Sequence, residues 1–394
     1  MSYHSSPEAS STQMKRTQMF IELHLIQNFA PANLNRDDTG NPKDCEFGGV
    51  RRARISSQCI KRAIRHEPVF EQITGKPNGK RTKWFIDKRL TPMLVAAGKP
   101  EAEAHKVASE FLTAFASKLE KDTAKTAVLL YFSKAELQGI VDALAANWAD
   151  VAAADDKKHA DAIAQLVKGL VKEYKNRTSA PDIALFGRML AEKPELNIDA
   201  ACQVAHAIST HRVTMEMDFY TAVDDLQPED TAGAGMMGFT AYDSACFYRY
   251  ARLDWEQLVE NLDGDVDLAH RTVEGFLRAS VSAIPTGKQN SFAAQNPPSF
   301  LLAVVKPRGM AWSLANAFER PVRPGSDGLT APSVAALDAY WGHLVAVYGL
   351  EDGAKVTALA LDDDLPLQNL KDYRVPTLEA WVKATLEALP AGEA

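Results

Sequence analysis

The sequence has few of the features that mark secreted, membrane-spanning or disulfide-stabilised proteins. Its 394 residues include only four cysteines, none in a CxxC spacing, so we expect no disulfide framework. No apolar run approaches the roughly 18 residues that a membrane helix needs. The first residues are polar and serine-rich without an apolar core, unlike a signal peptide. We therefore predict a cytoplasmic protein without a membrane partner, with a disordered leader over residues 1–18.

Motifs of the common enzyme classes are also missing, since GxxxxGK[ST], GxSxG and HExxH do not occur. Cys202 and His206 would share one face of a predicted helix, but no further ligand follows at metal-binding spacing. His24, on a predicted strand, reads as a sheet residue rather than a general base. We predict no catalytic residue, no metal and no cofactor. The alternative is a metal-dependent RNA endonuclease that uses the acidic clusters Asp37-Asp38, Asp224-Asp225 and Asp362-Asp363-Asp364, although aspartate in such loop-like sequence normally caps turns.

Charge is distributed unevenly along the chain. The net charge is −7, which by itself argues against a nucleic-acid partner. Residues 47–90, however, carry 12 Lys and Arg against three acids, whereas the rest of the chain is acidic. Such an uneven distribution of charge indicates an anionic partner on one surface. The alternative is a basic face that is merely solvated.

Hydrophobic periodicity predicts a mixed α and β fold. Strands are expected over residues 19–28, 183–189, 247–253 and 300–306, and helices from Ser56 or Ser57, over 200–209, 267–283, 334–347 and 377–389. Residues 102–175, including 128–132, show helical periodicity and suggest a helical insertion. The order matches a β-α-β-β-α-β core, as in ferredoxin-like and RRM folds, although the aromatic signature of RRM strands is missing.

The strongest binding candidate is the start of the first predicted helix. A helix N-terminus presents free N–H groups and a partial positive charge, which phosphate oxygens favour. The surrounding polar and basic side chains are Arg36, Lys43, Arg51, Arg52, Arg54, Ser56, Ser57, Gln58, Lys61, Arg62 and Arg65. This combination suits contact with a nucleic-acid backbone without reading of its bases.

Residues 212–243 are typical of a projecting hairpin. Period-two alternation puts Val213, Met215, Met217 and Phe219 on one face and Tyr220 on the other, and a glycine-rich stretch follows. Large apolar side chains on such a hairpin could wedge between bases or simply pack on the protein or a partner. The alternation favours Phe219 as the packing residue and Tyr220 as the nucleic-acid contact.

Several sequence strings resemble one known family and occur in the same order as in that family. They are LNRDDTGNPKDCEFGGVRRARISSQCIKRAIR (34–65), DIALFGRM (182–189), VAHAISTHRV (204–213), DFYTAVDDLQ (218–227), FYRYARL (247–253), PTGKQNSFAAQNPP (285–298) and SLANAFE (313–319). The chain is similar to the CasC family, the backbone subunit of the type I-E CRISPR Cascade complex.

The resemblance implies a non-catalytic subunit that polymerises along a crRNA guide in antiviral defence. Its expected partners are the guide, a target DNA strand, copies of itself, other Cascade subunits and a recruited helicase-nuclease. The implied α+β fold has an RRM-like palm (residues 19–66, 181–211 and 244–394, the last with C-terminal helices), helical fingers (67–180) and a thumb hairpin (212–243).

The resemblance also assigns roles to individual positions. The expected RNA-binding residues, including Arg54 from the basic cluster, are Arg36, Lys43, Arg54, Ser56, Gln58, Lys61, Arg62 and Arg65. The thumb wedge would comprise Phe219, Tyr220, Val223 and Met237. A lysine-bearing finger helix would offer Lys157, Lys158, Lys168 and Lys172 to target DNA.

Overall fold

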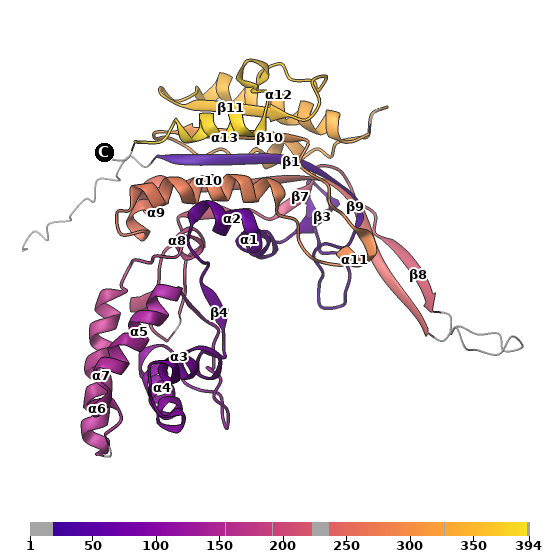
Figure 1. Cartoon of the computed structure of the whole chain (residues 1–394). Helices are drawn as coiled ribbons and strands as arrows, with labels where there is room; N and C mark the ends of the chain where they lie inside the picture. Colours follow the sequence, from indigo (N-terminus) through magenta and orange to yellow (C-terminus); the bar gives the residue numbers. More distant parts are fainter. Residues whose placement is uncertain (1–18, 154, 191, 223–235, 327, 392–394) are drawn as a thin grey trace, which may run out of the picture.

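A computed structural model of the chain describes residues 19–153, 155–190, 192–222, 236–326 and 328–391. The leader predicted for residues 1–18 lies outside the described residues. Figure 1 shows a central sheet from which a lobe of helices and a two-stranded hairpin both project on the same side.

The strand pairs of the central sheet are antiparallel, and β1 lies between β10 and β9. Its order is β11-β10-β1-β9-β7-β3-β2, and β6 and β8 also pair with β9. The strands are β1 (Phe20–Ala32), β2 (Asp44–Phe47), β3 (Val50–Ile55), β6 (Cys202–Val204), β7 (Ala207–Ser209), β8 (Glu216–Ala222), β9 (Met236–Asp254), β10 (Phe300–Lys306) and β11 (Lys355–Ala360).

Helices cover both faces of this sheet. Successive side chains of β1 point to opposite faces, and both sets are buried in a hydrophobic core. Leu23 and Leu25 pack with the helices of one face, whereas Ile26 packs with those of the other. The first face carries α1 (Ser57–His66), α2 (Pro68–Thr74), α9 (Trp255–Asn261), α10 (Val266–Ser282) and α13 (Leu378–Leu386). The other carries α12 (Thr330–Tyr348) and the 3-10 turn η3 (Leu314–Phe318), while the short α11 (Gln289–Phe292) and η4 (Lys371–Tyr373) lie in loops.

The helical lobe, residues 80–174, has a hydrophobic core of its own, built around Phe85, Phe111, Phe115 and Phe132. It contains β4 (Lys80–Thr82), the π-helical turn η1 (Ile86–Leu90), α3 (Thr91–Ala96), α4 (Glu101–Phe115), β5 (Leu130–Phe132), α5 (Lys134–Ala146), α6 (Trp148–Val151) and α7 (Asp156–Glu173). The chain returns to the sheet through α8 (Pro181–Phe186) and η2 (Pro194–Leu196).

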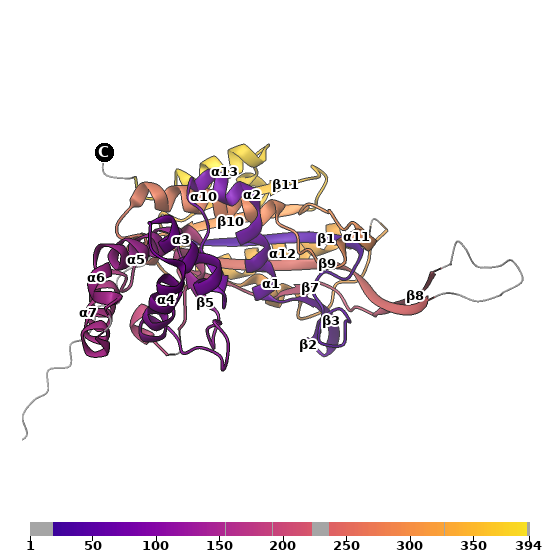
Figure 2. The same ribbon diagram turned by 60° about the horizontal axis from the view of Figure 1, so that its bottom comes forward.

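The hairpin arms, residues 216–222 and 236–242, pair with each other, beyond the part of β9 that pairs with β1. The second arm is the beginning of β9, whose later residues pair with β1 from Asp243 onward. One continuous strand therefore carries the hairpin on the sheet (Figures 1 and 2).

Most predicted elements are confirmed, and three are wrong. Residues 183–189 were predicted as a strand, but Pro181 begins a helix there, and short apolar runs do not distinguish the two. Residues 200–209 were predicted as a helix with Asp199 as its cap, but β6 and β7 pair with β9. Residues 130–132 belong to β5 rather than to a helix. In the last two segments, pairing with strands distant in sequence overrides the local periodicity.

Candidate nucleic-acid interface

Helix α1 begins where the sequence predicts it. The Ser56 hydroxyl accepts the backbone N–H of Cys59 at 3.3 Å and so caps the helix. Ile60 and Ile64 are buried against the sheet. Gln58, Arg62 and His66, spaced four residues apart, are exposed and form the outer ridge of the helix. The apolar pair thus directs the polar ridge away from the core.

The loop before β2 folds back onto this helix start. The side-chain oxygen of Asn35 accepts the Ser56 N–H at 2.8 Å, and its carbonyl accepts the Lys43 N–H at 2.8 Å. The Lys43 carbonyl in turn accepts the Arg54 N–H at 2.8 Å. These three hydrogen bonds bring the first turn of α1 together with the loop that carries Arg36 and Lys43.

The eight predicted RNA-binding residues therefore gather around one helix, but they are not equivalent. Arg36 and Arg62 are exposed, and neither forms an ion pair within the described residues. Lys61 is half-buried, with its ammonium 5.8 Å from the centre of the Phe186 ring. Arg54 donates to the Asp44 carbonyl at 3.0 Å and reaches His206 at 3.4 Å.

Arg65 has a structural partner. Its guanidinium pairs with the buried Asp182 carboxylate at 3.0 Å and donates to the Gly79 carbonyl at 3.2 Å. Only 11% of its side chain is exposed. Arg65 thus adds charge to the end of α1 while joining that helix to α8 and the helical lobe.

The pKa values of two histidines, His206 and His66, are lowered near the two ends of α1. Burial lowers the pKa of His206, and the positive charges of Arg54 and Lys43 lower it further. At the other end, burial lowers the pKa of His66, with added contributions from Arg65 and Arg62. Cations disfavour a protonated imidazole, so the smaller contributions from these neighbours reflect the positive charge around α1, which would stabilise a bound anion.

A cavity of about 570 Å³ adjoins the exposed ridge of α1. One wall contains Arg36, Arg62 and His66, and the opposite wall is the Ile284–Gly287 segment. Gly287 allows that segment to approach closely, because a side chain there would collide with the Leu34 carbonyl. The basic residues alone did not predict that the Ile284–Gly287 segment lines this cavity. The family-like string PTGKQNSF, which begins at residue 285, was the one sequence signal that could have identified it.

The residues considered for enzyme chemistry have other structural roles. Asp37 accepts the Thr39 hydroxyl at 2.7 Å and the N–H groups of Thr39 and Asn41 at 2.9 and 3.0 Å, and these bonds stabilise its own loop and lower its pKa. Asp363 pairs with Arg374. Asp224 and Asp225 lie outside the described residues. Within the described residues, no group of three or more His, Cys, Asp or Glu is arranged to hold a metal ion.

His24 lies inside the sheet, as expected. Its Nδ1 is 2.8 Å from the Tyr248 hydroxyl, and burial lowers the pKa of His24 to about 3. The ring is therefore neutral at physiological pH. Cys202 and His206 do not share a helix, since Cys202 lies on β6 and His206 follows it in a loop.

The hairpin arms expose large apolar side chains on both faces. On one face, Phe219 stands opposite Phe239, with ring centres 5.2 Å apart, beside Met217 and Met237. These four side chains are 52% to 70% exposed. On the other face, the Tyr220 ring lies across Gly238, where any Cβ would come within 2.5 Å of it. Val223, the remaining predicted wedge residue, lies outside the described residues.

The lysines proposed for target DNA lie on α7 and are all exposed. The spacing of Lys157, Lys168 and Lys172 puts them on one face of that helix. Lys158 points elsewhere and pairs with Asp150 at 2.9 Å. No helix in the described part of the chain is long and apolar enough to cross a bilayer.

Comparisons with known proteins bear on this geometry. The pattern of a family described as CT1975-like protein matches residues 21–385. A chain of a solved "CRISPR RNA-guided surveillance complex, pre-nicking" is 33% identical with a TM-score of 0.81, covering 94% of this chain and 99% of that one. A chain of a second "CRISPR RNA-guided surveillance complex" is 29% identical with a TM-score of 0.71, covering 94% and 100%. No curated protein matches the sequence.

The family match spans most of the chain, so this protein belongs to the CT1975-like family. Together with the two structures, it confirms the resemblance to the CasC backbone subunits of Cascade.

Proposed function

We propose that this protein is a non-catalytic, cytoplasmic subunit that binds the backbone of a crRNA guide along α1 and oligomerises on it in a type I-E Cascade complex. The observation that carries the proposal is the basic helix start. There, the capped helix α1 lies between the helical lobe and the hairpin (Figure 2), and several cations around its start have no ion pair in the described residues. Backbone contacts of this kind suit a complex in which base pairing by the guide supplies sequence specificity.

The architecture supports a division into palm, fingers and thumb. The palm would comprise residues 19–66, 181–211 and 244–394. Its chain order β1, α1, β7, β9, α10, β10 runs β-α-β-β-α-β, as in an RRM-like fold. The fingers would be residues 67–180 and the thumb residues 212–243.

The phosphate contacts would come from Arg36, Lys43, Arg54, Ser56, Gln58, Lys61, Arg62 and Arg65. Among these, Arg36, Gln58 and Arg62 are exposed, and the last two lie on the outer ridge of α1. Arg65 would act mainly by positioning, since Asp182 already holds its guanidinium. The half-buried Lys61 would contribute charge from the flank of the helix.

The remaining surfaces would serve assembly and target capture. The exposed apolar hairpin arms would reach a neighbouring copy, and Phe219, Tyr220, Val223 and Met237 would displace a guide nucleotide there. Lys157, Lys158, Lys168 and Lys172 would meet the target DNA strand. Other Cascade subunits and a recruited helicase-nuclease would complete the system, and the acidic remainder of the chain would limit non-specific nucleic-acid binding.

The direct test is the double variant Lys61→Ala/Arg62→Ala. Each phosphate contact to a single strand contributes about 0.7 to the log–log salt slope, so the slope of RNA binding should fall by about 1.4 per engaged subunit. Fluorescence anisotropy over a salt series measures it. The loss should be equal for unrelated RNA sequences, because phosphates carry no sequence information.

The matched control is Lys355→Ala/Lys371→Ala, which removes two exposed cations at the opposite edge of the sheet, on and beside β11. It should retain the wild-type slope. Equal slopes for the α1 variant and this control would refute RNA binding along α1. A loss confined to one RNA sequence would show base reading instead.

The wedge proposal predicts different outcomes for two adjacent residues. Tyr220→Ala should lose a base-stacking contribution of about 1–3 kcal/mol and blur the spacing of reactive nucleotides along a bound guide. Phe219→Ala should chiefly weaken the hairpin, because its ring packs on Phe239. Chemical probing of the bound RNA measures the spacing, with Tyr348→Ala, an exposed tyrosine on α12, as control. If both variants keep the wild-type spacing, neither residue is the wedge and Met237 becomes the candidate.

A further inference from the structure

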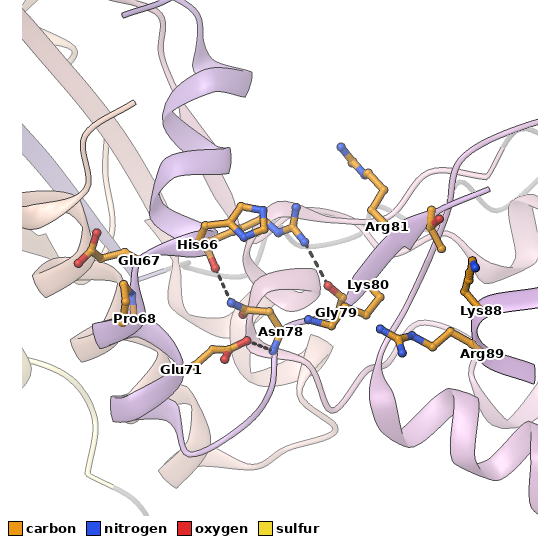
Figure 3. Close-up of a pocket in the computed structure, with 12 residues that line it drawn as sticks. His66, Glu67, Pro68, Glu71, Asn78, Gly79, Lys80, Arg81, Lys88 and Arg89 are labelled. Atoms are coloured by element: carbon orange, nitrogen blue, oxygen red, sulfur yellow. Dashed lines mark hydrogen bonds between the residues drawn. The ribbon is translucent and has the colours of Figure 1, made fainter. Parts of the chain in front are cut away.

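Two cavities meet where the helical lobe faces α1 and α2. The first, of about 510 Å³, lies between Arg65–Pro68 on one side and β4 and η1 on the other (Figure 3). The second, of about 430 Å³, has an apolar wall of Pro77, Pro92, Met93, Ala96 and Leu137. Lys80, Lys88 and Arg89 line both cavities. The two cavities thus share these three cations, and Lys134 also lines the second.

These cations have no ion-pair partner in the described part of the chain. Lys80 lies on β4, and Lys88 and Arg89 lie on η1; all three are exposed. Their neighbour Lys83, by contrast, pairs with Glu120 at 2.6 Å. Unpaired cations at the edge of a cavity can bind an external anion without first breaking a contact within the protein.

The backbone of η1 is itself unusual. It is a π-helical turn, a rare conformation that is frequent at functional sites. Ile86 and Leu90 are completely buried in the lobe core and anchor the turn. Lys88 and Arg89 therefore emerge side by side from a rigidly supported backbone, which lowers the entropic cost of holding a ligand.

The opposite wall offsets these cations only in part. Its two acids are Glu67 and Glu71, and Glu71 accepts the Asn78 N–H at 2.8 Å. Four cations without an ion pair in the described residues line the same cavity: Lys80, Arg81, Lys88 and Arg89. The pKa of His66, which also lines it, is lowered by burial and by several surrounding cations, Lys80 among them. The positive potential of α1 thus continues into the cavity.

We propose that the two cavities bind one nucleotide of a single strand, with its phosphate on Lys80, Lys88 and Arg89 and its base in the apolar cavity. The apolar cavity lies within the roughly 300–1,000 Å³ range of ligand pockets. The cations provide the complementary charge for the adjoining phosphate. The site rests on the proposed nucleic-acid function and adds contacts distinct from those on α1. The strand is either the guide or its DNA complement.

The test uses Lys88→Ala/Arg89→Ala in the full-length chain, with Lys106→Ala/Lys121→Ala as the control. The control residues are exposed lysines of the same lobe that line neither cavity. One arm measures the anisotropy of a short fluorescein-labelled oligouridine. The other measures capture of a labelled complementary oligodeoxyadenosine by RNA-loaded protein. Thermal melting verifies that each variant folds.

In the affected arm, we expect roughly tenfold weaker binding and a salt slope lower by about 1.4, for two lost phosphate contacts. A loss in the RNA arm assigns the site to the guide. A loss confined to the DNA arm assigns it to the target strand. If the variant behaves as its control in both arms, the proposal is wrong.

The base compartment is tested separately by Ala96→Phe, which fills the apolar cavity without changing charge. Ala96 is exposed on α3, so the substitution is compatible with folding. Val95→Phe is the control, because Val95 is 41% exposed on the same helix and does not line the cavity. Ala96→Phe should weaken the same arm as the charge variant, and Val95→Phe should not. Equal binding by the two would overturn the placement of the base.

Failure of this inference is distinguishable from failure of the proposed function. Suppose that Lys61→Ala/Arg62→Ala weakens RNA binding, whereas Lys88→Ala/Arg89→Ala weakens neither RNA binding nor DNA capture. Only the second site is then refuted. If the α1 variant binds as its own control, the proposed guide contact is refuted as well.

Discussion

Replacing residues 218–240 with an Asn-Gly turn should leave a folded protein that binds RNA but no longer forms long assemblies on it. The replacement joins Met217 to Ala241, which are paired across the hairpin, and Asn-Gly suits a two-residue turn between antiparallel strands. The sheet pairing of β9 with β1 begins at Asp243 and remains intact. The palm should therefore keep its stability.

The expected loss follows from the exposure of the hairpin arms. Met237 and Phe239 are 67% and 70% exposed, respectively. Large exposed apolar side chains gathered in this way mark interaction surfaces, because burying them in a partner removes them from water. Without the hairpin, neighbouring copies would lose that contact.

Sedimentation on a long guide RNA measures assembly, and circular dichroism measures folding. A control with Glu216→Gln on the retained part of the hairpin should assemble normally. Unchanged sedimentation of the shortened protein would show that the hairpin does not join neighbouring copies.

Asp182→Ala should strongly destabilise the junction between the helical lobe and the sheet. The Asp182 carboxylate is completely buried and accepts hydrogen bonds from Arg65, Tyr131 and the Gly79 N–H, the last at 3.0 Å. Burial and the nearby carboxylate raise the pKa of Tyr131, so its hydroxyl stays protonated and donates. Removing the carboxylate would leave Arg65 without its anionic partner in a buried site.

Breaking a buried ion pair by deleting one partner typically costs about 3–5 kcal/mol. We expect a loss of this size in the free energy of unfolding, measured by urea denaturation. Hydrogen exchange should also accelerate in β4 and α8, which the carboxylate joins to α1. Asp263→Asn is the control, because its pair with Arg177 is exposed, such pairs contribute about 1 kcal/mol or less, and asparagine tolerates the positive φ of this position. A loss no larger than that of the control would show that Asp182 does not hold the junction together.

Local sequence patterns predicted the start of α1 and its exposed face, but they did not predict which distant segments contact that helix. Ser56 followed by Ile60 and Ile64 determines both the cap and the buried face of α1, so the polar ridge could be predicted from spacing alone. The ion pair of Arg65 could not be predicted in this way, because its partner Asp182 lies 117 residues further along the chain. The Ile284–Gly287 wall is likewise contributed by a distant segment.

The same distinction explains the errors in secondary structure. Residues 200–209 contain apolar residues at spacings compatible with a helix, and only pairing with β9 makes them strands. The π-helical turn at η1 had no recognisable local signal.

By itself, the sequence determined the concentration of positive charge in residues 47–90, the start of α1 and the family of the protein, because composition, capping and motif identity are local properties of the chain. Tertiary structure alone decided which cations remain unpaired, which segments line the cavities and which side chains the hairpin exposes. These outcomes depend on contacts between residues far apart in sequence, whose partners are chosen by packing and burial rather than by local preference.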